Sequence, residues 1–195
     1  NRKSPRHNWA GHGTRIHELS FSREGTFVAS GGRDGMIHVY SLESGQMQFR
    51  LDAHQLSVMS VCFSPDGERL ASAGQEGDMH VWDVNGRRRL FTLHGHSGPV
   101  WDHAYTPDGK RLVSAGGDFL VKEWDAEASQ ESHTLPISRI SGNVHALSYG
   151  ARGRLLAWGN TAGQVGIWDT KQKREVFRLE RPEANRNTRI WSIAV

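Results

Sequence analysis

The sequence repeats with a period of about 42 residues, and this period restricts the fold more than any other feature of the chain. The segment Ile16 to Phe21 has counterparts at Val58 to Phe63 and Val100 to Tyr105, each 42 residues further on, and at Val144 to Tyr149 after a step of 44. The four units end on an aromatic residue followed by Ser or Asp, at Tyr40-Ser41, Trp82-Asp83, Trp124-Asp125 and Trp168-Asp169. The first three begin with a small residue and His, at Gly11-His12, Ala53-His54 and Gly95-His96. Such a chain is expected to fold as similar modules that pack on one another.

Apolar residues inside each unit recur with a period of two, as at Ile37 and Val39, which indicates β-strands. The segments Pro65-Asp66-Gly67 and Pro107-Asp108-Gly109 favour tight turns, because Pro fixes one φ angle and Gly accepts a positive one. Asn85-Gly86 marks a further hairpin. We therefore predict that each unit is a four-stranded antiparallel sheet. Because a sheet this small cannot bury both of its faces alone, the units are expected to stack radially into an all-β propeller.

The landmarks of the units, taken together, resemble the WD-repeat β-propeller family. They are the Gly-His opening, the Ser-Pro-Asp-Gly turn at 64–67, the Ala-Ser-Ala-Gly strand at 71–74 and the Trp-Asp ending, and the resemblance covers about residues 9–195. It implies that residues 11–52, 53–94, 95–136 and 137–180 are blades one to four.

Members of this family resemble closed rings of about six to eight blades, whereas this chain holds about 4.6 repeats. The resemblance therefore implies an incomplete arc of a larger ring. Residues 1–10 are expected to be the outer strand of a preceding or closing blade, and residues 181–195 the inner strand of a fifth. We expect a longer parent chain to supply the remaining blades, with a second copy as the alternative.

The family resemblance also implies a buried, hydrogen-bonded tetrad of His, Ser, Asp and Trp in each blade, with a structural and not a catalytic role. Blade three has the full set, His96, Ser114, Asp118 and Trp124. Blade one has His12, Ser30, Asp34 and, in place of Trp, Tyr40. Blade two has His54, Ser72, Trp82 and, in place of Asp, Glu76. Blade four keeps Trp168 and carries Ile140, Trp158 and Ala162 at the His, Ser and Asp positions. Losing all three polar groups together destabilises a blade less than losing one and leaving its buried partners without hydrogen bonds.

The same resemblance implies that partners dock on the top face and central opening of the ring. By position, the residues that follow the first apolar residue of each inner strand belong there, namely His17, Met59, Trp101, His145 and Trp191. The residues before the tetrad acid lie beside them, namely Arg33, Gln75, Gly117 and Thr161. Side chains of these types supply large contact areas at interfaces, although Trp101 and Trp191 could instead fill gaps between blades.

Blade three carries two polar residues where its sister blades carry apolar ones. His103 replaces Leu or Val, and Glu123 replaces Val or Ile. Since a buried carboxylate needs a partner, we hypothesise a His103–Glu123 pair, direct or through a water molecule. The alternative is that each residue has its own partner or faces solvent.

Other sequence features exclude several classes of protein. The formal net charge is only +3, and no apolar run approaches the roughly 20 residues of a membrane span, so we expect no membrane partner and favour the cytoplasm. Cys62 has no second Cys, and Ser20, Ala104 and Ser148 fill its position in the sister blades, so we reject thiol catalysis. His94 and His96 have no third ligand nearby in the sequence, so we expect no metal and no cofactor.

These observations predict a non-catalytic scaffold that binds a protein or peptide on the top face. One alternative is binding of an anionic ligand or nucleic acid through Arg-rich edges such as Arg87, Arg88 and Arg89. Charged residues on an outer strand also prevent edge-to-edge pairing with other sheets, which explains these arginines without a ligand. No aromatic residues for base stacking alternate with them, so we do not expect nucleic-acid binding. A propeller that regulates an attached enzyme domain is a further alternative. An enzyme would need His17, His145 or Asp102 to converge at the central opening.

Overall fold

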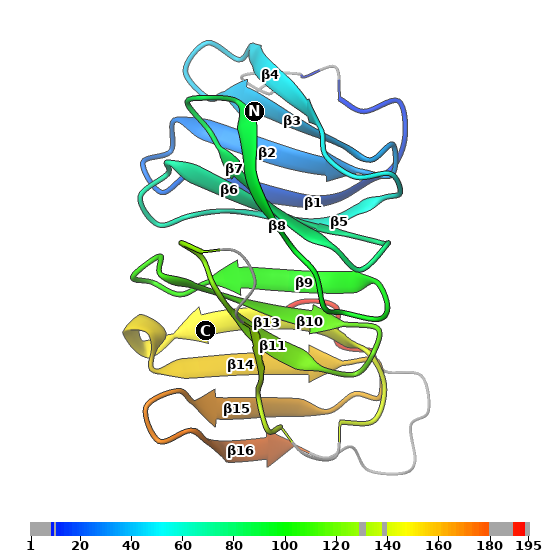
Figure 1. The fold of residues 1–195 in the computed structure, drawn as a ribbon, viewed down its shortest axis with the longest axis vertical. Coiled ribbons are helices and arrows are strands. Elements are labelled where there is room, and N and C mark those ends of the chain that lie inside the picture. The colour runs from blue at the N-terminus through cyan, green and yellow to red at the C-terminus, as the bar shows by residue number, and fades with distance from the viewer. Residues whose placement is uncertain (1–8, 10, 129–131, 138–139, 180–188, 194–195) are drawn as a thin grey trace, which may run out of the picture.

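The chain folds into four-stranded antiparallel sheets that follow one another along the sequence (Figure 1). The structure is a computed structural model and describes residues 9, 11–128, 132–137, 140–179 and 189–193. The sheet of blade one contains β1 (Ile16–Phe21), β2 (Phe27–Gly32), β3 (Met36–Ser41) and β4 (Met47–Asp52). That of blade two contains β5 (Val58–Phe63), β6 (Arg69–Gly74), β7 (Met79–Asp83) and β8 (Arg88–Leu93).

The remaining two sheets have the same up-and-down order of strands. Blade three contains β9 (Val100–Tyr105), β10 (Arg111–Gly116), β11 (Val121–Asp125) and the short β12 (Ser132–Thr134). Blade four contains β13 (Val144–Gly150), β14 (Leu155–Asn160), β15 (Val165–Asp169) and β16 (Arg174–Leu179), with a 3-10 turn, η1 (Ala151–Gly153), between β13 and β14. Within the described residues, no helix is long and apolar enough to cross a membrane.

Local turn chemistry sets the hairpins that the sequence predicts. Gly67 and Gly109 both have positive φ angles, 75° and 72°, which residues with a Cβ rarely adopt. In the first of these turns, Asp66 accepts a hydrogen bond from the backbone N–H of Glu68 at 3.0 Å. The carboxylate thus replaces a backbone acceptor and closes the turn between β5 and β6.

The sheets fan outward from a common side. The first strands of successive sheets, β1, β5, β9 and β13, pack on one another, whereas the last strands, β4, β8, β12 and β16, do not share such packing in the described part of the chain. Figure 1 shows the four sheets in chain order along the long axis. This arrangement confirms the predicted all-β propeller architecture, and the described sheets form an open arc.

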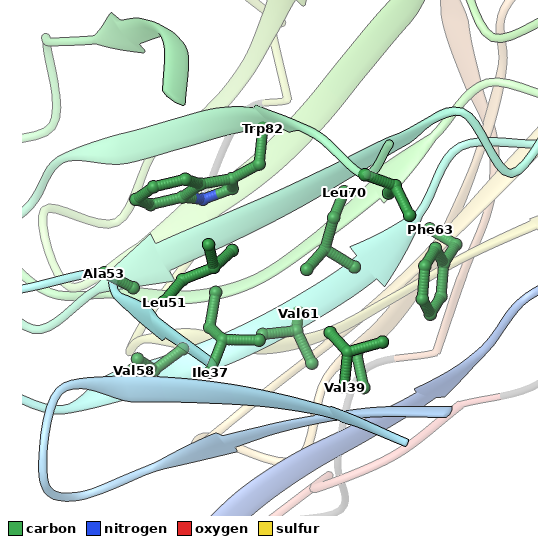
Figure 2. Close-up of a cluster of buried hydrophobic side chains, with 11 residues drawn as sticks. Ile37, Val39, Leu51, Ala53, Val58, Val61, Phe63, Leu70 and Trp82 are labelled. Atoms are coloured by element: carbon green, nitrogen blue, oxygen red, sulfur yellow. The ribbon is translucent and has the colours of Figure 1, made fainter. Parts of the chain in front are cut away.

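Apolar side chains fill each space between neighbouring sheets. Between blades one and two, Ile37, Val39 and Leu51 face Val58, Val61, Leu70 and Trp82, all of them buried (Figure 2). Equivalent clusters join blade two to blade three and blade three to blade four. Full burial of one such side chain contributes about 1.5–3 kcal/mol, so stacking of the sheets is the main source of stability.

The outer faces of the first and fourth sheets remain exposed in the described structure. Phe21 of β1 is 63% exposed, whereas Phe63 at the same position of β5 is 8% exposed. Leu179 of β16 is 54% exposed, whereas Leu93 of β8 is fully buried. The described residues therefore leave one apolar face uncovered at each end of the arc.

The predicted flanking strands lie mostly outside the described residues. Of residues 1–10, only Trp9 is described, and its ring stacks on Tyr40 with centroids 5.3 Å apart. Of residues 181–195, positions 189–193 are described and form no regular strand. Ile190 nevertheless donates its N–H to the carbonyl of Asn160 at 3.1 Å and packs on Gly159, as Val58 packs on Gly31. Both flanking strands stay predictions.

Candidate functional site

The tetrad residues of blade three form one continuous chain of hydrogen bonds. Trp124 donates its Nε1–H to the hydroxyl of Ser114 at 2.7 Å, and that hydroxyl lies 2.7 Å from Nε2 of His96. Nδ1 of His96 lies 2.9 Å from both carboxylate oxygens of Asp118. Burial lowers the pKa of His96, which favours the neutral ring, so Nδ1–H donates to the carboxylate and Nε2 accepts from the hydroxyl.

Blade two repeats this chain with a longer acid. Trp82 donates to Ser72 at 3.0 Å, and Nε2 of His54 lies 2.9 Å from the same hydroxyl. Nδ1 of His54 lies 2.6 Å from Oε1 of Glu76. The extra methylene of Glu76 is accommodated because its carboxylate is the solvent-facing end of the hydrogen-bond chain, with a side chain that is 23% exposed.

Blade one keeps the His-Ser-Asp part of the chain. His12 lies 2.9 Å from Ser30 through Nε2 and 2.9 Å from Asp34 through Nδ1. The hydroxyl of Tyr40 lies 3.1 Å from Nδ1 of His38, which in turn stacks on His12 with centroids 3.9 Å apart. An additional histidine therefore stands between the tetrad histidine and the aromatic residue.

Blade four has another polar network in place of a tetrad. The fully buried indole of Trp158 fills the space, and Gly166 lies against it, since a Cβ at this position would overlap the ring. Asn160 donates from Nδ2 to Oε1 of Gln164 at 2.7 Å, and the backbone N–H of Ser141 donates to the same oxygen at 3.1 Å. The sequence analysis noted the loss of the tetrad's polar residues and missed this replacement network.

The hypothesis of a His103–Glu123 pair is wrong. His103 is opposite Ser114 in the sheet, and Ser114 is opposite Lys122, so Glu123 points to the other face. Glu123 pairs with Arg111 at 2.8 Å. His103 is 3% exposed, and its ring makes no side-chain hydrogen bond among the described residues; the backbone of Ala71 is its polar neighbour, without a hydrogen bond of good geometry. His103 is in register with Lys122, and Glu123 is the next residue along that strand, so its side chain points to the opposite face of the sheet.

Most of the predicted partner-binding residues line one cleft of about 540 Å³ where the inner strands begin. Its lining includes the predicted residues His17, Met59, Trp101, His145, Thr161 and Trp191. Arg33 and Gln75 are exposed and do not line this cleft, and Gly117 lies beside the indole of Trp101. We name this hollow the rim cleft.

Aromatic rings form a row along the rim cleft. The rings of Trp101 and His145 lie 4.5 Å apart between centroids, and those of His145 and Trp191 lie 5.1 Å apart with an edge-on geometry. The guanidinium of Arg189 lies 5.7 Å from the ring of Trp191. This row gives blade three, blade four and the segment after blade four a shared apolar surface.

Two buried polar atoms in the rim cleft lack partners within the described residues, Nε1 of Trp101 and Nε2 of His17. Burial, Arg15 and Arg33 lower the pKa of His17, and burial and Arg189 lower that of His145, so both rings are neutral near pH 7.

The enzyme alternative needs His17, His145 or Asp102 to converge at the central opening; His17 and His145 line the rim cleft, whereas Asp102 does not. Its carboxylate accepts hydrogen bonds from the hydroxyl of Ser60 at 3.2 Å and from the N–H groups of Leu147 at 2.7 Å and His103 at 2.8 Å. These contacts join blades two, three and four. Asp102 therefore links blades.

Several residues of the rim cleft were not predicted from the sequence, namely Arg15, Glu18, Asn143 and Arg189. They flank the strand starts, so extending the position matching by one or two residues on each side would have found them. The histidines at 38 and 80 were not predicted either. The signal was present, because both stand two residues before the aromatic end of their unit, where blades three and four have Lys122 and Gly166.

Comparisons with known proteins agree with the propeller fold. A family model described as "WD domain, G-beta repeat" matches residues 3–41, 45–83 and 87–125. No curated protein matches the sequence. A similar solved structure, titled "Crystal Structure of Mitotic Checkpoint Complex", aligns with a TM-score of 0.77 and 27% identity over 88% of this chain. The alignment covers 55% of that other chain, so the present chain spans about half of its length.

Proposed function

Because this chain belongs to the WD domain, G-beta repeat family, we propose that it is a non-catalytic scaffold that binds a protein or peptide partner in the rim cleft. Propellers of this family generally act as protein-interaction scaffolds and are typically not enzymes. The similar solved structure is titled as a complex, which supports the same kind of role. The binding face proposed for this chain is the rim cleft, and the binding residues are those that line it.

The row of aromatic rings at the rim carries the proposal. Trp191 is 62% exposed at one end of the row, and Trp101 stands at the other end. Tryptophans dominate binding energy at interfaces, because they bury a large area with few rotatable bonds. An extended peptide fits this row, because its apolar side chains can pack on successive rings.

The Arg-rich edge of blade two does not favour an anionic ligand. Arg87 lies over the ring of Phe49 at 5.3 Å, and Arg88 lies 3.8 Å from Asp83. Arg89 lines a different cleft. The three guanidinium groups therefore have separate contacts and do not converge on one anion.

A peptide selection followed by affinity measurements tests the proposal. The purified chain is used to select peptides from a random library, and fluorescence polarisation gives the Kd of each peptide for wild type, Trp101→Ala and Gln75→Ala. We expect Trp101→Ala to weaken binding by about 2 kcal/mol, roughly 30-fold, because it removes one of the two tryptophans of the rim cleft.

Gln75→Ala is the control, since Gln75 is exposed, was also predicted to bind a partner and lies outside the rim cleft. Circular dichroism verifies that both variants are folded. Equal affinity of Trp101→Ala and wild type would refute the rim cleft as the binding site. A steep loss of affinity with added salt, common to all variants, would instead support an anionic ligand at the Arg-rich edges.

A further inference from the structure

We propose that a pocket between blades three and four binds a small aromatic carboxylate, a molecule with one ring system and one carboxylate on a short chain. The pocket has a volume of about 330 Å³, at the lower end of the range of roughly 300–1,000 Å³ for sites that hold small molecules. None of its lining residues lines the rim cleft, so it is separate from the proposed peptide-binding face. We name it the interblade pocket.

The other two interfaces between described blades fill the equivalent position with a phenyl ring. Val39 of β3 is opposite Phe49 of β4, and both pack in the apolar cluster between blades one and two, where Figure 2 shows Val39. Val81 of β7 and Phe91 of β8 form the same pair in the cluster between blades two and three. Both valines are fully buried, so one valine and one phenylalanine close this part of each interface.

Blade three has polar residues at both positions. Glu123 of β11 is opposite His133 of β12, in the places of Val and Phe, and both line the interblade pocket. Arg111 forms an ion pair with Glu123 at 2.8 Å, within its own blade. Its counterpart Arg69 instead reaches from blade two to blade three and donates to the carbonyl of Ala126 at 2.6 Å. Between blades three and four, the described residues lack both the phenyl ring and this arginine bridge, which leaves the pocket open.

Blade four supplies an aromatic wall to the interblade pocket. Tyr149 of β13 and Trp168 of β15 line it, and Trp168 is 4% exposed. Leu135 of blade three adds an aliphatic surface and belongs to the same apolar cluster as the two rings. A flat aromatic ring buries a large area against such walls and takes the place of the missing phenyl group. The aromatic part of the proposed ligand follows from this wall.

The charged groups of the interblade pocket favour an anion. They are Arg111, Lys173 and Glu123, two cations against one anion, so the lining is net positive whether or not His133 is protonated. Lys173 is exposed and forms no ion pair with another described residue. Arg111 gives one N–H group to Glu123 and has further N–H donors. A single carboxylate on the ligand therefore balances the charge of the lining.

The same lining disfavours other charged aromatic molecules. An aromatic amine would bring its cation next to Lys173 and Arg111, and a phosphate ester would bring a second negative charge next to Glu123. Burial and the Glu123 carboxylate raise the pKa of Tyr149, so its hydroxyl keeps its hydrogen near pH 7 and can donate it to a carboxylate. A ring with one carboxylate therefore matches the aromatic wall and the cations together.

Binding of phenylacetate to the complete chain tests the proposal. Saturation-transfer NMR detects the bound ring, a titration gives the Kd, and phenylacetamide is the neutral probe of the same shape. We expect wild type to bind both, and phenylacetate about fivefold more tightly, because its carboxylate forms an exposed ion pair with Lys173. Lys173→Asn should remove this preference, and Asn is chosen because Lys173 has a positive φ of 52°, which Asn tolerates. Lys171→Asn, at an exposed residue outside the pocket, is the matched control and should keep the preference.

Substitutions of His133 test the position of the bound ring. His133→Phe introduces the residue of blades one and two, so its ring should fill the interblade pocket and abolish binding of both probes. His133→Ala leaves the space open and should bind both probes. Circular dichroism verifies that every variant is folded. Absence of phenylacetate binding to wild type, unchanged binding in His133→Phe, or an unchanged preference for phenylacetate over the amide in Lys173→Asn would overturn the proposal.

Discussion

Replacing His103 with leucine should stabilise the protein. His103 lies between the sheets of blades two and three and is 3% exposed, and among the described residues its ring has only the backbone of Ala71 as a polar neighbour, without a hydrogen bond of good geometry. The sister blades carry Leu19, Val61 and Leu147 at this position, so the fold accommodates an apolar side chain here. We therefore expect His103→Leu to have a higher free energy of unfolding than wild type at pH 7.

The size of the gain follows from two terms. A buried polar group without a partner destabilises the folded state by about 1–3 kcal/mol, and leucine removes that penalty without leaving a large cavity. The second term depends on pH, because burial lowers the pKa of His103 from 6.5 to about 4. Below pH 6.5 the unfolded chain takes up a proton that the folded chain does not, so wild type loses stability as the pH falls toward 4. By pH 5 this adds about 2 kcal/mol to the advantage of the variant.

Urea denaturation followed by circular dichroism, at pH 7 and at pH 5, measures both terms. The reverse exchange, Leu147→His in blade four, is the matched control and should lower stability, more so at pH 5. The other buried histidines remain in every variant, so the comparison rests on differences between variants. A variant His103→Leu no more stable than wild type, or an advantage that does not grow at pH 5, would refute the reasoning and show that His103 has a partner in solution.

Three further substitutions test other parts of the fold. His96→Ala should lower stability by about 1–3 kcal/mol, because it breaks the tetrad of blade three; an unchanged melting temperature would contradict this. Gly166→Ala should destabilise by a similar amount, about 1–3 kcal/mol in chemical denaturation, because its Cβ overlaps the indole of Trp158, whereas Gly13→Ala in open space should be neutral. Burial raises the pKa of Asp102 from 3.8 to about 7, so the stability that it contributes is full below pH 3.8 and is lost as the pH rises through 7. Asp102→Asn should flatten that part of a melting-temperature series, and parallel curves for the two proteins would argue against it.

The architecture could be predicted from the sequence because its determinants are local. Alternating apolar residues specify strands, and turns such as Pro65-Asp66-Gly67 specify hairpins, so each unit defines its own sheet. The period then makes all units alike, and identical modules with two apolar faces can bury them only by stacking. Residues at the same repeat position, His17, Met59 and Trp101, were predicted to share one face, and they line one cleft.

The failed prediction for His103 and Glu123 shows where position matching reached its limit. A repeat position shows which residues are equivalent along the chain, but it does not show which face of the sheet each side chain occupies relative to a residue two strands away. The facing of a side chain depends on strand register, and one residue of offset places it on the opposite face.

The sequence by itself determined the repeated sheets, because strand alternation and turn formation depend on residues a few positions apart. Only the tertiary structure decided which polar groups meet. Asn160 with Gln164 in blade four, and His54 with Glu76 and His80 in blade two, come together through strand pairing and ring stacking. Each of these contacts includes a residue in which one blade departs from the others, such as Glu76 in blade two. A repeat pattern describes what the blades share, so it does not predict such contacts.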